Sequence, residues 1–192
     1  MTGEAASTSE SGIEHVELRV AGWLLRRPRP EETADALAML TDPEVLQWNP
    51  VTSVADAATA EEWLARGADW SDGDHATFSV IEAATGRFAG NVSLHKIDRE
   101  QATAWIGYRV AAWARGRGAA TATVAEVTGW AFTALGIERV ALCHAVANPA
   151  SCRVAVKAGY AAEGTLRASW AHDDGNRYDE HLHGRLARDP FP

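Results

Sequence analysis

The sequence predicts a mixed α/β domain built around a central sheet. Two observations favour this class: segments with strand periodicity and with helical periodicity interleave along the chain, and the 192 residues are 46% apolar and 23% charged, as in ordinary globular domains. A chain of this length buries a core without disulfide or metal staples. We expect a disordered tail of small, polar and acidic residues over 1–12 and a single domain over 13–192.

The first half of the chain predicts a strand segment followed by helices. Apolar and polar residues alternate over 15–26, as in a strand or hairpin, and prolines end that segment. Helical spacing of apolar residues predicts one helix over 31–40 and a second over about 56–68. Between these helices we expect a short turn at 42–43 and a loop at 48–50.

The second half changes to strand periodicity and then alternates between strands and helices. Strands over 77–82 and 87–97 are joined by a hairpin turn, and a third strand covers 102–110. A glycine-rich turn then leads into a long helix, which Gly136 ends. The later segments are this helix over about 119–135, a strand over 139–147, a short helix over 150–158, an extended segment over 160–170 and a last strand over 178–186.

Charge and composition exclude several classes of partner. The formal net charge is -8, which argues against a general nucleic-acid binder because such proteins present a basic face. No apolar run is long enough to span a bilayer, and the first residues do not have the pattern of a signal peptide. Cys143 and Cys152 lack disulfide-framework or metal-ligand spacing, as is usual in a reducing cytosol. We expect a cytoplasmic protein, monomeric or homodimeric, with no nucleic-acid or membrane partner.

The glycine-rich turn after the strand over 102–110 has the composition of a diphosphate cradle. Gly116 and Gly118 let several backbone N–H groups point at one place, and the start of the next helix adds its own free N–H groups. Arg115 and Arg117 supply mobile positive charge. The alternative is a plain connection that needs glycine only for its geometry. The turn is neither a dinucleotide-binding fingerprint nor a P-loop, because it lacks the third glycine and the Gly-Lys-Ser/Thr of those motifs.

Two motifs resemble a known family. Arg115-x-x-Gly118-x-Ala120 resembles the Gln/Arg-x-x-Gly-x-Gly/Ala signature of GNAT acetyltransferases, which binds the pyrophosphate of CoA. The segments over 148–160 and 163–167 are similar to the C-terminal motif of the Rim-type branch, which includes ribosomal-protein N-terminal acetyltransferases. The resemblance covers nearly all of 13–188.

This resemblance implies a mostly antiparallel mixed sheet in which two neighbouring parallel strands, here 105–110 and 139–146, splay apart. The unpaired strand edges would bind the pantetheine arm of acetyl-CoA like an added strand. Acetyl-CoA is the implied cosubstrate, and we expect no metal. Arg153 and Lys157 could meet cofactor phosphates or simply form a solvated helix face. The expected cofactor-binding residues are Tyr108, Arg109, Val110, Arg115, Gly116, Arg117, Gly118, Ala119, Ala120, Thr121, Asn148, Ser151, Arg153 and Lys157.

Three residues are candidates for catalysis by proton transfer. Many relatives place a tyrosine seven residues after the asparagine, where this chain has Ala155, but the Rim-type branch has a serine at the position of Ser151. We therefore expect Ser151 to protonate the leaving thiolate, the alternative being a serine that caps the helix. Many relatives carry a glutamate where Trp105 stands, so an obvious general base for the acceptor amine is missing. His95 or His144 could serve as that base, or each could be structural.

The resemblance implies that three tryptophan-bearing segments flank the acceptor site, and a histidine-rich segment lies near the last hairpin. Trp48, Trp105 and Trp170 could line an aromatic pocket for the acceptor, or simply be buried. We expect two further tryptophans to pack in the core. In the last strand, alternation puts two histidines on one face and a glutamate on the other. Their spacing could suggest a metal site, but the sequence fixes no further ligand, so we expect none. The residues concerned are Trp113 and Trp130 for packing, and His172, Asp173, Glu180, His181 and His183 for the histidine-rich segment.

The expected function is transfer of an acetyl group from acetyl-CoA to a primary amine, by direct attack without an acyl-enzyme. The acceptor is an amine-bearing small molecule or a protein N-terminus, with the tryptophans tilting the choice slightly to a small molecule. The alternative from another class is a non-catalytic acyl-CoA-binding module, which the missing glutamate and tyrosine favour.

Overall fold

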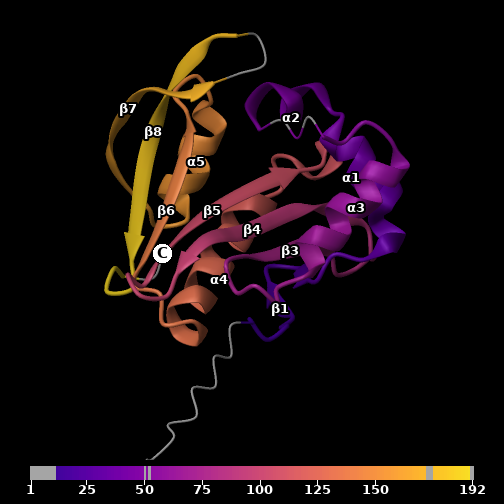
Figure 1. Ribbon diagram of the computed structural model, residues 1–192, viewed down its shortest axis with the longest axis horizontal. Coiled ribbons are helices and arrows are strands. Elements are labelled where there is room, and N and C mark those ends of the chain that lie inside the picture. Colours follow the sequence, from indigo (N-terminus) through magenta and orange to yellow (C-terminus); the bar gives the residue numbers. More distant parts are fainter. Residues whose placement is uncertain (1–11, 50, 52, 172–174, 191–192) are drawn as a thin grey trace, which may run out of the picture.

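The computed structural model describes residues 12–49, 51, 53–171 and 175–190, so the predicted tail lies almost entirely outside the described residues. One 8-stranded sheet has the strand order β1-β2-β3-β4-β5-β6-β8-β7 (Figure 1). Neighbouring strands are antiparallel except β5 and β6, which are parallel. The strands are β1 (Leu18–Val20), β2 (Trp23–Arg26), β3 (Ala76–Glu82), β4 (Phe88–Asp98), β5 (Thr103–Val110), β6 (Arg139–Ala145), β7 (Ala161–Ala171) and β8 (Arg177–Leu186).

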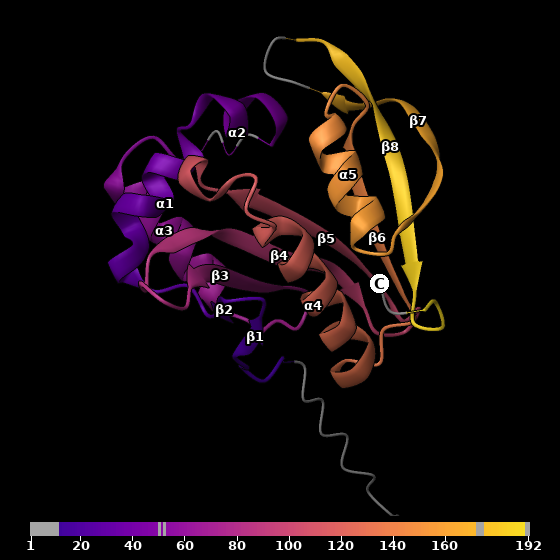
Figure 2. The same cartoon turned by 180° about the vertical axis from the view of Figure 1, so that it is seen from behind.

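Helices cover both faces of this sheet. Helices α4 and α5 lie on one face, and α1 and α3 lie on the other, as the opposite views of Figures 1 and 2 show. None of the helices within the described ranges is both long and apolar enough to cross a membrane. The helices are η1 (Pro30–Glu32) and η2 (Ala112–Ala114), both 3₁₀, and α1 (Thr33–Leu40), α2 (Pro43–Trp48), α3 (Ala57–Ala68), α4 (Ala119–Ala134) and α5 (Pro149–Lys157).

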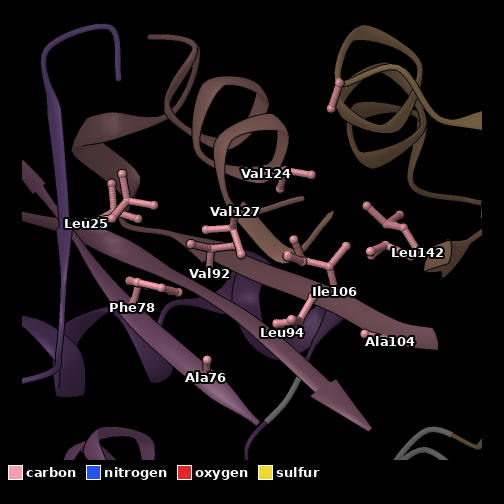
Figure 3. Packing of buried hydrophobic residues seen from close by; sticks show 14 of the residues in the cluster. Leu25, Ala76, Phe78, Val92, Leu94, Ala104, Ile106, Val124, Val127 and Leu142 are labelled. Carbon is pink, nitrogen blue, oxygen red and sulfur yellow. The ribbon is translucent and has the colours of Figure 1, made fainter. Parts of the chain in front are cut away.

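The larger core lies between the sheet and α4 (Figure 3). Phe78, Val92 and Ile106 come from three neighbouring strands, and Val124 and Val127 of α4 pack on the same face. A smaller core joins α1, α2 and α3 to the other face. Because strand side chains alternate between faces, β4 and β5 present apolar residues to α4 and mainly polar ones to the opposite side.

The parallel strands β5 and β6 pair only at their beginnings. Their register contains three pairs, which run from Thr103↔Arg139 to Trp105↔Ala141. Beyond Trp105, β5 continues in register with β4 as far as Val110, and β6 continues with β8. The strands therefore diverge after a short common segment, which confirms the splay that the sequence resemblance implies.

The segment after α1 is a helix, and the expected short turn at 42–43 was wrong. The Asp42 carboxylate accepts from the N–H of Glu44 at 3.0 Å and from that of Val45 at 3.4 Å, and Pro43 occupies the first turn. An Asp cap followed by proline is a helix start as well as a turn signal. Helix α2 therefore extends to Trp48, where a loop over 48–50 was expected, and residue 50 lies outside the described residues. The other predicted elements are confirmed, with small shifts of their ends.

A close backbone contact fixes β4 against β5. Gly90 has a φ of 148°, and a Cβ placed on it would lie 2.1 Å from the carbonyl oxygen of Arg109. The β3–β4 register also shifts here, between Val80 and Ile81. Only glycine allows this approach, which sets the position of the strand that carries Tyr108 and Arg109.

Gly90→Ala is expected to destabilise the protein by on the order of 2–5 kcal/mol, because strain at this φ and overlap with β5 add together. Gly164→Ala in β7 is the matched control: no atom lies within 4 Å of its Cβ position, so its effect should stay within about 0.5 kcal/mol. Urea unfolding of both variants measures the difference. A Gly90→Ala protein as stable as the control would contradict the close contact.

Candidate active site

The glycine-rich turn before α4 presents free backbone N–H groups. Gly116 and Gly118 have φ angles of 73° and 81°, and a Cβ on either would point into open space. Gly118 is the N-cap of α4, whose first hydrogen bond runs from the Ala122 N–H to the Gly118 carbonyl at 3.0 Å. The N–H groups of 119–121 therefore have no acceptor within the helix. Such a helix start favours an anion, as the diphosphate interpretation requires.

Arg115 and Arg117 are both held by carboxylates. Arg115 forms ion pairs with Asp42 at 2.5 Å and with Glu44 at 3.0 Å, and its hydrogen bond keeps the pKa of Asp42 below the usual range. Arg117 forms an ion pair with Glu82 at 2.5 Å. The two arginines thus tie the turn to α2 and β3, and the free donors of the turn are its backbone N–H groups.

A hydrogen bond connects the two sides of the strand split. The hydroxyl of Tyr108 in β5 donates to the Ser151 hydroxyl in α5 at 2.9 Å, and Ser151 is buried. Burial raises the pKa of Tyr108, so the phenol keeps its proton at neutral pH. Because Ser151 accepts from Tyr108, its own proton is available for donation. Sequence reasoning assigned only the backbone of Tyr108 to the site and missed this side chain, since the pair lies 43 residues apart.

Asn148 takes the capping role that was the alternative for Ser151. Its side-chain oxygen accepts from the Ser151 N–H at 3.0 Å, which makes Asn148 the N-cap of α5. The Ser151 hydroxyl instead faces Tyr108. Asn148 was expected to contact the cofactor; here its side-chain oxygen holds the helix that positions Ser151.

The opposite face of the sheet carries a row of polar side chains. The β4–β5 register pairs Asn91 with Arg109 and His95 with Trp105. Residues paired directly across antiparallel strands share a face, and Tyr108, one residue from Arg109, lies on the other. The structure therefore separates Tyr108 and Ser151 from His95 and Arg109 by the thickness of the sheet.

A cavity of about 240 Å³ opens on this polar face, beside α3. Its lining includes Trp63, Asn91, Ser93 and Arg109. Arg109 donates through Nη2 to the Asn49 side-chain oxygen at 2.8 Å and through Nε to the Asn49 carbonyl at 3.2 Å. It forms no ion pair with the described residues, and burial lowers its pKa to about 10, so it stays charged at neutral pH. The cavity thus offers a cation without a carboxylate partner.

His95 lies on the cavity side and meets the requirements for a base. It is half-buried in β4, and burial, with Lys96 and Arg109 nearby, lowers its pKa below the usual value. The imidazole is therefore neutral at pH 7 and able to accept a proton.

His144, the other candidate base, lies on the α5 side. Trp105 pairs with Ala141, so alternation along β6 turns His144 away from the face of His95. It is buried, and its Nε2 lies 3.1 Å from Nε2 of His183. The two candidate bases, His95 and His144, therefore lie on opposite faces of the sheet.

Trp113 and Trp130 pack in the fold as expected, whereas the three tryptophans expected to line the acceptor pocket do not gather in one place. Trp113 donates to the Phe88 carbonyl at 3.0 Å, and the Trp130 ring stacks edge-on against Phe78. Trp48 and Trp105 are half-buried, Trp170 is exposed, and no ring contact between these three is found in the described chain. Arg153 and Lys157 are exposed on α5, and His172 and Asp173 lie outside the described residues.

Comparison with known proteins decides the family. Residues 23–161 match the family model described as "Acetyltransferase (GNAT) domain". The chain belongs to the GNAT acetyltransferase family. GNAT acetyltransferases use acetyl-CoA as the acetyl donor, which favours an enzyme over the non-catalytic alternative.

Its relatives support the RimJ/RimL-like branch. "Putative ribosomal N-acetyltransferase YdaF" of Bacillus subtilis (strain 168) is 36% identical over 102 residues, which are 52% of this chain and about half, 55%, of that protein. "Uncharacterized N-acetyltransferase p20" of Bacillus licheniformis is 28% identical over 82% of this chain and 89% of that one. The structure of Mycobacterium smegmatis RimJ in complex with CoA-disulfide has a TM-score of 0.78 and 26% identity, covering 90% of this chain and 87% of that one.

Gly118→Asp is expected to abolish acetyl-CoA binding, because it places an anion and a side chain against the backbone donors of the turn. Gly136→Asp is the matched control, with the same charge change and a positive φ of 67° at the other end of α4. The measurement is the rise in melting temperature with acetyl-CoA, which follows ligand binding to the folded state. Equal rises in both folded variants would place the cofactor elsewhere.

Ser151→Ala is expected to lower kcat about 10–100-fold while acetyl-CoA affinity changes little, because only proton donation is removed. Tyr108→Phe should reduce kcat in the same direction, since it removes the donor behind Ser151. The Asn148 cap persists in both variants, so their melting temperatures should stay near that of the wild type. An unchanged kcat in Ser151→Ala would remove this serine from the mechanism.

Proposed function

We propose that the enzyme transfers the acetyl group of acetyl-CoA directly to a primary amine bound on the cavity side of the strand split. The observation that carries the proposal is the two-sided arrangement: His95 lies on the same face of the sheet as Arg109, which lines the cavity, and Tyr108 bonds Ser151 of α5 on the other face. A base on one face and an acid on the other suit a reaction in which the amine approaches from one side and the thiol leaves on the other.

The chemistry removes two protons from the acceptor ammonium, adds one to the leaving thiolate and needs one charge-stabilising contact. His95 takes the proton from the ammonium, so that a neutral amine attacks the thioester carbonyl. Backbone N–H groups of the unpaired β5 edge over 108–110 would hold the pantetheine arm and stabilise the oxyanion. As the C–S bond breaks, Ser151 gives its proton to the thiolate, and the attacking nitrogen releases its second proton, which restores the Ser151 hydroxyl.

The protonation state of the Cys143 thiol favours direct attack over an acyl-enzyme. Burial raises the pKa of Cys143 in β6 to about 11, so its nucleophilic thiolate form is scarce at neutral pH. The tyrosine-supported serine is placed to give a proton rather than to attack, because no base accepts a hydrogen bond from it among the described residues.

The cavity favours a small amine that carries an anionic group. Its volume of about 240 Å³ suits a small molecule or the first residues of a peptide, and Arg109 is positioned to pair with a carboxylate or phosphate. A protein N-terminus is the second candidate, because the name of the YdaF relative describes a ribosomal N-acetyltransferase. A cytoplasmic location remains a prediction.

Acetyl-CoA turnover, followed by thiol release, is expected with small amines bearing a carboxylate or phosphate, and more weakly with their uncharged analogues. With a good acceptor, kcat should fall as the pH drops through a value below 6.5, because the lowered pKa of His95 keeps the base neutral down to that point. His95→Gln should reduce kcat about 10²–10⁴-fold and remove this acid limb.

His15→Gln, in the exposed N-terminal segment, is the matched control and should keep both rate and pH profile. A His95→Gln enzyme with the wild-type acid limb would contradict the assignment of the base. If peptide N-termini are acetylated efficiently and small amines are not, the second candidate acceptor is the correct one.

A further inference from the structure

Three histidines and a cysteine meet between β6, β8 and α5. Their possible ligand atoms, one from each of His144, Cys152, His181 and His183, all lie within 4.8 Å of one another. His144 is 6% exposed and His183 is 1% exposed, while the other two side chains are half-buried. Such a set of nitrogen and sulfur atoms below the surface matches the ligand preference of zinc.

The topology explains why residues so far apart in the sequence converge. The β6–β8 register places His144 opposite His181 and Leu142 opposite His183, so both β8 histidines and His144 lie on one face of the sheet. Cys152 reaches the same place from the first turns of α5. Cys143 pairs with Leu182 instead and points to the other face.

Hydrogen bonding prepares His144 as a metal ligand. Its Nδ1 lies 2.8 Å from the Ala145 carbonyl; a carbonyl only accepts, so Nδ1 carries the proton and Nε2 keeps its lone pair. This contact with a backbone carbonyl is the usual outer support of a metal-binding histidine. The lone pair points at Nε2 of His183, 3.1 Å away.

The spacing of the two buried imidazoles is close to that in a zinc site. With Zn–N distances of about 2.0–2.1 Å, two nitrogens on a tetrahedral zinc lie about 3.4 Å apart, compared with 3.1 Å for the Nε2 atoms here.

We propose that His144, Cys152, His181 and His183 bind one Zn²⁺ ion, which fastens β8 and α5 to β6. Binding displaces the thiol proton of Cys152, so that the thiolate and three neutral imidazoles fill a tetrahedral shell. Four protein ligands leave no open position for water or substrate, which is the pattern of a structural site. The ion therefore stabilises the fold beside Ser151 and takes no part in acetyl transfer.

The test is a cobalt titration of the full chain after treatment with a chelator. The wild type should bind one equivalent of Co²⁺ with the intense visible bands of a tetrahedral site and a thiolate-to-cobalt charge-transfer band in the near ultraviolet. Cys152→Ser should lose the charge-transfer band and bind more than 100-fold more weakly, since removing a ligand costs more than the about 10–100-fold that an outer contact costs.

Two control variants and a second measurement accompany the titration. Cys143→Ser should keep both bands and the affinity, because Cys143 faces away from the cluster. His75→Ala removes the second group with ligand spacing, Asp72, Asp74 and His75, and should change nothing. Zn²⁺ should raise the melting temperature of the wild type and Cys143→Ser but not of Cys152→Ser. Absence of a charge-transfer band in the folded wild type, or its survival in Cys152→Ser, would overturn the proposal.

Discussion

The short parallel pairing of β5 with β6 is the constraint on which the site depends. Three residue pairs hold the two strands together, and after Trp105 each strand relies on its antiparallel neighbour on the outer side. The split costs little stability because both strands keep a full partner on one edge. It leaves backbone groups of β5 and β6 without strand partners, and the Tyr108–Ser151 hydrogen bond spans the gap. A fully paired sheet would have no place for a cofactor arm.

Features that depend on local sequence were predictable. The glycines of the turn, Gly116 and Gly118, predict a helix start with free N–H groups. The period of two along the last strand predicts that His181 and His183 lie on one face. Helix α2 was missed because an Asp followed by Pro marks a turn and a helix start alike, and only the hydrogen bonds of Asp42 decide between them. The divergence of β5 and β6 was predicted only from the resemblance of the motifs to the family, because no local pattern indicates it.

Features that depend on register were not predictable. Whether His95 and His144 share a face follows from how β4, β5 and β6 align, and a shift of one residue would reverse the answer. The contacts between Tyr108 and Ser151 and between Asn49 and Arg109 join residues 43 and 60 positions apart. A contact between two single side chains at such separations leaves no periodic pattern in the sequence. The sequence therefore identifies candidate site residues, and only the structure shows which of them lie together.

Helix α2 links the glycine-rich turn before α4 to the cavity on the opposite face of the sheet. At its first turn, Asp42 and Glu44 hold Arg115 of the glycine-rich turn; at its other end, Asn49 holds Arg109, which lines the cavity. A helix of six residues moves as one body. A displacement of Arg115 that moved this helix would therefore also move the Asn49 groups that hold Arg109. Any such coupling is reciprocal, so each substrate changes the affinity of the other by the same factor.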